Sequence, residues 1–278
     1  MNAVVVGIDP RRPSVPALLW AADEAARRGL GLRLVAAVPP LGGRHGSGDA
    51  FTQHRTLRER AESALASTED FVRELHADLS PVTELVDGAP VAVLGERAAH
   101  AALVVVGSRR PSRPTEVLRD GSVALPLTAR AGCPVVVVRE PEHTQVYPRT
   151  IVVGVDDPHS GEAAVAFAVH EAMLRRARLR AVWVRPPPAP GSADDGLAEC
   201  RRLLAGRAAV WAEHHPGLDV VAEVVCGQPV QQLALVSQSA LALIVERGGA
   251  AGAWGGSTVR GLLHYAGCPV ITVPAPER

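Results

Sequence analysis

The sequence predicts an α/β protein made of two copies of one domain, each with helices covering a parallel sheet. Two observations predict this fold. Short runs of apolar residues alternate with longer segments of helical spacing, as in sheets that are buried on both faces. In addition, a series of short motifs occurs twice in the 278 residues, at the offset of a whole domain. With 47% apolar and 21% charged residues, each copy can bury a core.

The elements of the first copy follow from apolar periodicity and from breaker residues. Strands are predicted at Ala3–Ile8, Leu32–Val38, Val82–Val86, Leu103–Val106 and Val135–Val138. A first helix carries apolar residues at helical spacing from Ala17 to Ala25 and stops at Gly29. Further helices are predicted at Gln53–Leu79, at Val91–Ala101 and, shorter, from Ser122.

The repeated motifs define the two domains. Gly7-Ile8-Asp9, which ends the first strand, recurs 147 residues later as Gly154-Val155-Asp156. Gly132-Cys133-Pro134-Val135 recurs 135 residues later as Gly267-Cys268-Pro269-Val270. We therefore predict domains at 1–140 and 150–278, joined by a polar segment that contains two prolines.

The composition excludes several classes of function. Twenty-nine basic residues balance twenty-nine acidic ones, whereas a dedicated nucleic-acid binder carries a basic excess. Every basic residue is arginine, so the chain has no lysine for a Schiff base or for a Walker A phosphate loop. No apolar run reaches membrane-spanning length and no leader peptide is apparent, which predicts a cytoplasmic protein without membrane or nucleic-acid partners.

Neither a metal site nor a catalytic residue is predicted. The four cysteines, at positions 133, 200, 226 and 268, form no C-x-x-C motif and no cluster with histidines. We therefore interpret them as buried structural thiols. The order of Ser, His, Asp and Cys residues along the chain matches no catalytic triad.

The carboxyl ends of the strands are the predicted ligand-binding edge. Open parallel sheets bind ligands beyond these ends, at the point where the strand order reverses. Asp9 follows the first strand, Gly107 follows the fourth, and Asp156 is the counterpart of Asp9. Both aspartates could instead be turn or helix-cap residues only, because Asp favours such positions. The two alternatives stay open.

In these motifs and their order, the sequence resembles the universal stress protein family in its tandem two-domain form. The G-(I/V)-D turn, the Gly88-Ala89-Pro90 and Gly227-Gln228-Pro229 turns, the Gly-Ser pairs before the last helices and the G-C-P-V strand starts are all shared. The resemblance covers nearly the whole chain. It implies a five-stranded parallel sheet of flavodoxin-like type in each half.

Some members of that family bind ATP through a loop of pattern G-x2-G-x9-G-(S/T). Its glycines let the backbone approach the phosphates, and amides at a helix N-terminus donate to them. The resemblance implies ATP as a ligand, held by Asp9, Ala37, Gly107, Gly121, Ser122 and Val123 in the first copy and by Asp156, Val184, Gly249, Gly256, Ser257 and Thr258 in the second. The two Gly-Ser pairs are also good helix caps without any ligand.

Neither copy keeps the whole loop. In the first, Arg110 replaces the second glycine of the pattern, and ten residues instead of nine separate it from Gly121. A cation there can bind a phosphate, so Arg110 joins the candidate site. In the second, Glu246 replaces the first glycine of the pattern, and only six residues separate Gly249 from Gly256. Because a carboxylate repels phosphate, we expect ATP in the first copy rather than in the second.

We therefore expect a non-catalytic stress-response module that binds ATP in its first domain. One alternative is a ligand-free scaffold that acts through protein contacts. Another is a slow ATPase, disfavoured because no lysine and no evident base would position a water. Members of the family dimerise through the last strand, and both Pro134–Arg139 and Pro269–Val273 are apolar. This implies an intramolecular pseudo-dimer of the two domains, which could also assemble into a homodimer.

Overall fold

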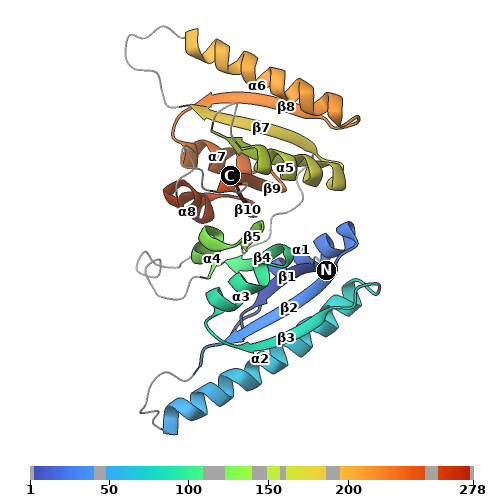
Figure 1. The fold of residues 1–278 in the computed structure, drawn as a ribbon, viewed down its shortest axis with the longest axis vertical. Coiled ribbons are helices and arrows are strands. Elements are labelled where there is room, and N and C mark those ends of the chain that lie inside the picture. The colour runs from blue at the N-terminus through green and yellow to red at the C-terminus, as the bar shows by residue number, and fades with distance from the viewer. Residues whose placement is uncertain are drawn as a thin grey trace. The chain divides into compact units, whose positions relative to one another are not determined.

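The computed structural model describes residues 3–40, 48–108, 123–139, 149–156, 161–185, 195–247 and 256–275. The chain divides into two compact units, unit 1 (Met1–Pro141) and unit 2 (Glu142–Arg278). Within each unit, strands and helices alternate along the described chain, as the sequence predicts (Figure 1).

The described residues of unit 1 form nine elements. They are β1 (Ala3–Ile8), α1 (Val15–Arg28), β2 (Gly31–Val38), α2 (Gly48–Leu75), β3 (Val82–Asp87), α3 (Pro90–Ala98), β4 (Ala101–Ser108), α4 (Ala124–Arg130) and β5 (Val135–Arg139). Unit 2 consists of β6 (Thr150–Val155), α5 (Glu162–Arg175), β7 (Arg178–Arg185), α6 (Asp195–His214), β8 (Val220–Cys226), α7 (Pro229–Ser237), β9 (Ala242–Arg247), α8 (Gly256–Tyr265) and β10 (Val270–Pro274). The order of elements is the same in both units, which confirms the predicted duplication.

The strands of each unit form a parallel sheet, in the order β3-β2-β1-β4-β5 in unit 1 and β8-β7-β6-β9-β10 in unit 2. The predicted five-stranded parallel sheets are therefore confirmed. In unit 1 the chain moves outward from β1 to β3 and then returns to the other side of β1 for β4. We call this reversal, between β1 and β4 and likewise between β6 and β9, the switch point of the unit.

Both faces of the sheet in unit 1 are packed by helices, and two glycines show how closely the helices approach. Gly7 pairs with Val106, so Gly7 and Gly107 point to opposite faces. A Cβ atom at position 7 would lie 2.8 Å from Leu94 Cδ1 in α3. One at position 107 would lie 2.4 Å from Ser14 Cβ at the start of α1. Helices α3 and α1 therefore cover the two faces.

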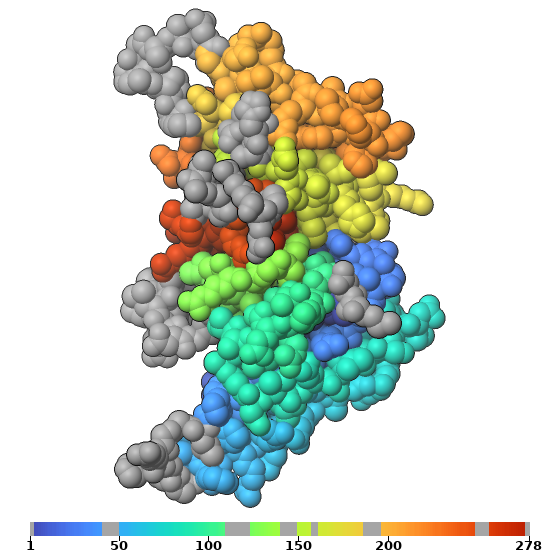
Figure 2. All heavy atoms as spheres, in the orientation of Figure 1, coloured from blue at the N-terminus to red at the C-terminus, as the bar shows by residue number. Residues whose placement is uncertain are grey.

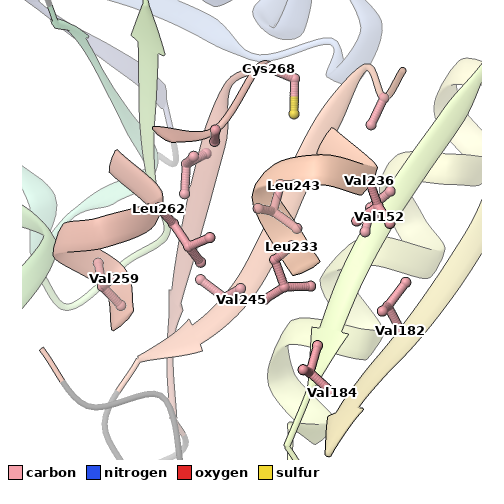
Figure 3. Close-up of a cluster of buried hydrophobic side chains, with 13 residues drawn as sticks. Val152, Val182, Val184, Leu233, Val236, Leu243, Val245, Val259, Leu262 and Cys268 are labelled. Atoms are coloured by element: carbon pink, nitrogen blue, oxygen red, sulfur yellow. The ribbon is translucent and has the colours of Figure 1, made fainter. Parts of the chain in front are cut away.

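One face of unit 2 packs the cluster shown in Figure 3. The strands contribute Val152 of β6, Val182 and Val184 of β7, and Leu243 and Val245 of β9, and the helices contribute Leu233 and Val236 of α7 and Val259 and Leu262 of α8. Alternate strand residues take part because successive side chains point to opposite faces. These apolar contacts bury one side of the sheet under α7 and α8.

The long helices α2 and α6 each have one buried and one exposed side. In α2 the buried residues include Leu65 and Val72, seven positions apart, and in α6 they include Leu204 and Ala208, four apart. This spacing places them on one stripe of each helix. The opposite side of α6 carries exposed residues such as Val210 and forms part of the outer surface of unit 2, drawn in orange in Figure 2.

Both ends of the long helix and the end of the helix that follows it differ from the prediction. The long helix was expected at Gln53–Leu79, but α2 begins at Gly48 and ends at Leu75, and His76 instead places its Nε2 2.9 Å from Asp23 Oδ1. Pro81, which disfavours helical backbone just before it, follows soon after. The helix predicted to reach Ala101 ends at Ala98, because Ala101 already pairs with β1.

The prediction that all four cysteines are buried is wrong for one of them. Cys133, Cys200 and Cys268 are buried as predicted, but Cys226 is exposed, because it ends the edge strand β8. Burial raises the pKa of the Cys268 thiol well above its usual range. In the described part of the chain, no helix is long and apolar enough to cross a bilayer, and no three His, Cys, Asp or Glu side chains gather as metal ligands.

Candidate functional site

The candidate site of unit 1 lies at its switch point, at the carboxyl ends of β1 and β4. Gly7 of β1 pairs with Val106 of β4, so the two strands end at the same level of the sheet. Asp9 directly follows β1, and Gly107 is the last residue but one of β4. The structure thus brings to one edge the two residues that the strand pattern predicts there.

Asp9 stabilises the turn that leaves β1. Its Oδ1 accepts a hydrogen bond from the backbone N–H of Arg11 (2.9 Å), and its carbonyl oxygen accepts one from the backbone N–H of Arg12 (3.1 Å). Of the two alternatives for Asp9, the turn role is therefore present in the structure. The residue is also exposed, and its contact with a ligand stays a prediction.

Gly107 lets the first turn of α1 approach the end of β4. A Cβ atom at position 107 would lie 2.4 Å from Ser14 Cβ and 2.7 Å from Ser14 Oγ, so a side chain there would force the helix to move. Ser14 is the N-cap residue of α1, yet its hydroxyl makes no capping hydrogen bond. Pro16, the second residue of the helix, has no N–H to donate to it.

Ser14 is a candidate residue that the sequence analysis did not single out. Its Oγ is buried and has no hydrogen-bond partner among the described residues. A serine just before a helix with an early proline is a recognisable N-cap signal. The sequence alone does not show that the hydroxyl lacks its usual donor and lies against Gly107.

The other predicted residues of unit 1 are only partly described. Ala37 is buried in β2, and Val123 is half-buried as the N-cap residue of α4. Arg110, Gly121 and Ser122 lie outside the described residues. Their contacts with a phosphate therefore stay predictions.

In unit 2, Glu246 occupies the position that Gly107 holds in unit 1. Gly7 pairs with the residue before Gly107, and its counterpart Gly154 pairs with the residue before Glu246. The glycine of the first switch point is thus a carboxylate in the second.

The Glu246 carboxylate binds the start of α5. Its Oε2 accepts hydrogen bonds from the backbone N–H groups of Ala163 (3.0 Å) and Ala164 (3.3 Å), the second and third residues of that helix. A negative charge at a helix N-terminus is stabilising, by about 0.3–1 kcal/mol when exposed and up to about 2 kcal/mol when partly buried. Glu246, expected from its charge to repel phosphate, thus also occupies the helix N-terminus itself.

Bulky side chains fill the carboxyl end of the sheet in unit 2. Trp183 of β7 is only 3% exposed, and the residue at its register position in unit 1 is Ala36. Val184 was carried over from the resemblance as a binding residue, but its side chain packs in the cluster of Figure 3. At these two positions unit 1 carries smaller side chains, Ala36 and Ala37, and they are buried like their counterparts.

The remaining predicted residues of unit 2 lie on two elements. Asp156 is half-buried directly after β6. Gly256 and Ser257 are exposed at the start of α8, and Thr258 is buried in the same turn. Gly249 lies outside the described residues.

Known proteins match this chain over nearly its full length. The model of the universal stress protein family matches residues 1–139 and 148–274. The universal stress protein Rv2005c of Mycobacterium tuberculosis is 33% identical over 292 residues, which cover 97% of this chain and 96% of that protein. The crystal structure of a universal stress protein from Archaeoglobus fulgidus covers 99% of this chain and 97% of its own, with a TM-score of 0.71 at 14% identity, and shows the same fold. The resemblance stated from the motifs is thus confirmed.

Two solved universal stress proteins are complexes with adenine nucleotides. One, in complex with cAMP, covers 49% of this chain and 96% of its own, at 26% identity and a TM-score of 0.39. The other, from Archaeoglobus fulgidus in complex with dAMP, covers 49% and 97%, at 22% identity and a TM-score of 0.35. Each covers about the length of one unit.

Proposed function

Because this chain belongs to the universal stress protein family, we propose that it is a non-catalytic stress-response protein that binds ATP in unit 1 alone. The observation that carries the proposal is the difference at one register position, Gly107 in unit 1 against Glu246 in unit 2. The adenine nucleotides bound by the related domains make this ligand class the natural one to test.

The switch point of unit 1 offers groups that suit a phosphate. The N-terminus of α1 carries the positive end of the helix dipole, and the glycine at position 107 keeps negative side chains away from it. The Ser14 hydroxyl is a buried donor without a partner in the described chain, which a phosphate oxygen would satisfy. Asp9, exposed at the same edge, is an acceptor for ribose hydroxyls.

We propose binding rather than hydrolysis. Phosphoryl transfer depends on cations that stabilise the transferring group and on a residue that positions the water. The chain contains no lysine, and its motifs show no evident base that would position a water. Release of phosphate is therefore not part of the proposed function.

Calorimetric titration of the purified chain with ATP tests the proposal. We expect one site per chain. Ser14→Ala should weaken binding about tenfold, since it removes one donor to the phosphate, while leaving stability unchanged or higher, since it removes an unpartnered buried hydroxyl. The matched control is Ser257→Ala at the start of α8, which should leave the affinity unchanged because unit 2 does not bind.

Each other result has a defined meaning. No heat of binding and no nucleotide in the purified protein by mass spectrometry would favour the ligand-free scaffold. Phosphate release that saturates with ATP would favour the slow ATPase. Two equal sites per chain would contradict restriction to unit 1.

A further inference from the structure

Helix α5 has no capping side chain at its N-cap position. The N-cap residue is Gly161, at φ 76°, and it makes no side-chain capping hydrogen bond. An N-cap side chain normally accepts hydrogen bonds from the N–H groups of the second and third helical residues. In α5 these are Ala163 and Ala164, and both donate to the carboxylate of Glu246, which comes from the end of β9. The cap is thus supplied by a strand more than eighty residues away.

We propose that Glu246 is a built-in anionic ligand of unit 2: it holds the first amides of α5 as a bound anion would, and so determines that this unit takes no nucleotide. The capping contact stands on the geometry alone. The exclusion of nucleotides rests on the proposed function.

The two units differ at three positions that belong together. Unit 2 has Gly161, Ala163 and Glu246 where unit 1 has Ser14, Pro16 and Gly107. The proline removes one of the two N–H donors, the glycine removes the carboxylate, and the serine occupies the space beside the end of β4. In unit 2 the three residues allow two N–H donors to bind an acceptor from the same chain. In unit 1 the corresponding residues lack that acceptor and one of the donors.

The contact occupies two of the amides that an incoming phosphate would use at the start of α5. The N–H groups of Ala163 and Ala164 already have an acceptor, and the carboxylate adds a negative charge at the point where a phosphate would arrive. The occupied donors and the added charge therefore both act against a phosphate at this point.

Amide hydrogen exchange of the full chain tests the cap. In the wild type, the amides of Ala163 and Ala164 should be protected, and Glu246→Ala should speed their exchange about tenfold or more, because each loses a hydrogen bond to a charged acceptor. Glu246→Gln, which keeps the shape and one acceptor oxygen, should give an intermediate rate. The control is Glu199→Ala, an exposed glutamate of α6 paired with Arg202, which should leave both amides unchanged.

Titration with inorganic pyrophosphate then tests whether Glu246 holds an anion site. In Glu246→Ala, pyrophosphate should shift the amide resonances of Ala163 and Ala164 saturably and slow their exchange again. In the wild type it should shift neither. Because the readout is in unit 2 and the probe is not ATP, failure of ATP to bind unit 1 would leave this result intact.

Three outcomes would overturn the inference. Unchanged exchange at the two amides in both Glu246 variants would show that the carboxylate does not cap α5. Pyrophosphate shifts at these amides in the wild type would show that the site is open despite Glu246. Faster exchange in Glu246→Ala without any effect of pyrophosphate would make Glu246 a helix cap only.

Discussion

The two units of this universal stress protein share their strand order, their helix order and the way helices cover the sheet, but they differ in what lies at the switch point. In unit 1, Gly107 leaves the strand end without a side chain, and the Ser14 hydroxyl beside it lacks a partner in the described chain. In unit 2, Glu246 places a carboxylate on the helix amides. The duplicated domains thus keep one fold while their switch points carry different groups, a glycine in unit 1 and a carboxylate in unit 2.

The largest expected effect comes from moving the carboxylate of unit 2 into unit 1. In Gly107→Glu the new Cβ would clash with Ser14, and Pro16 would leave the carboxylate one donor short. We expect the free energy of unfolding to fall by about 3–5 kcal/mol, as for a buried charge without its partners. Denaturant unfolding followed by circular dichroism measures it.

The same substitution has a control and a rescue. Gly95→Glu in α3, where a Cβ would meet nothing within 4 Å, should change stability by less than about 1 kcal/mol. Adding Ser14→Gly and Pro16→Ala to Gly107→Glu should restore most of the loss, because it rebuilds the arrangement of unit 2. If the triple variant is as unstable as Gly107→Glu alone, the three positions do not act together.

A second prediction concerns a feature that both units retain. Glu24 of α1 and Glu171 of α5 are fully buried, and each pairs with an arginine one turn later, Arg28 and Arg175. Glu24→Gln and Glu171→Gln should each lower the free energy of unfolding by about 3 kcal/mol, since each leaves a cation without its carboxylate. The measurement is again denaturant unfolding.

Comparing the stability losses of Glu24→Gln and Glu171→Gln tests whether the two units are equivalent at this position. Glu62→Gln, which removes an exposed partner of Arg58, should lower stability by less than about 0.5 kcal/mol. A large loss for one buried glutamate and none for the other would mean that the units are not equivalent here, contrary to their matched burial and pairing.

A third prediction uses the ion pair between Glu84 and Arg97 of unit 1, whose arginine is replaced by valine in the repeat. Glu84 of β3 accepts hydrogen bonds from Arg97 of α3 and from Arg33 of β2. Its counterpart Glu223 accepts hydrogen bonds from Arg180, the counterpart of Arg33, and the repeat has Val236 at the position of Arg97. The hydrogen bond from Arg97 is the main cause that lowers the pKa of Glu84. Arg97→Val should therefore lower the free energy of unfolding by about 1 kcal/mol at pH 7.

The sign of the pH dependence follows from that lowered pKa. A carboxyl with a depressed pKa in the folded state contributes stability above its unfolded pKa and loses it as the pH falls through the folded value. The difference between wild type and Arg97→Val should therefore shrink below about pH 4 and vanish at still lower pH. A difference that stays constant from pH 7 to pH 2.5 would mean that Arg97 acts through packing and not through charge.

The smallest change in the free energy of unfolding is expected at the C-terminal ends of α1 and α5, the first helix of each unit. Gly29 after α1 and Arg176 after α5 both adopt the left-handed conformation, at φ 62° and φ 48°. This conformation suits glycine, so Arg176→Gly should raise the free energy of unfolding by about 0.5–1 kcal/mol and Gly29→Ala should lower it by about 1 kcal/mol. Thermal unfolding resolves both, and a stabilising Gly29→Ala would contradict this interpretation.

Much of the fold could be predicted from the sequence because its signals are local. The apolar run Ala3–Ile8 is the strand β1, and the motifs that recur in order predict the duplication. The boundary at Ala101 was missed because pairing with β1, a tertiary contact, decides it. The end of α2 was missed similarly, at the contact between His76 and Asp23.

The candidate site was predictable only in part. Asp9 and Gly107 could be assigned to one edge because strand ends and the switch point follow from the order of elements. The contact between Glu246 and the amides of Ala163 and Ala164 depends on register and on a left-handed Gly161, which one sequence does not reveal. Pairing of the last strands into a pseudo-dimer, further homodimerisation and the roles of the phosphate-loop residues stay predictions.

The most direct test of the account is ATP titration of the full chain, followed by the amide resonances of both units in one experiment. Binding restricted to unit 1 predicts saturable shifts around Gly107 and Ser14 with one ATP per chain, and no shift at Ala163 or Ala164 at the same concentrations. Shifts in both units with equal affinity, or in unit 2 alone, would contradict it.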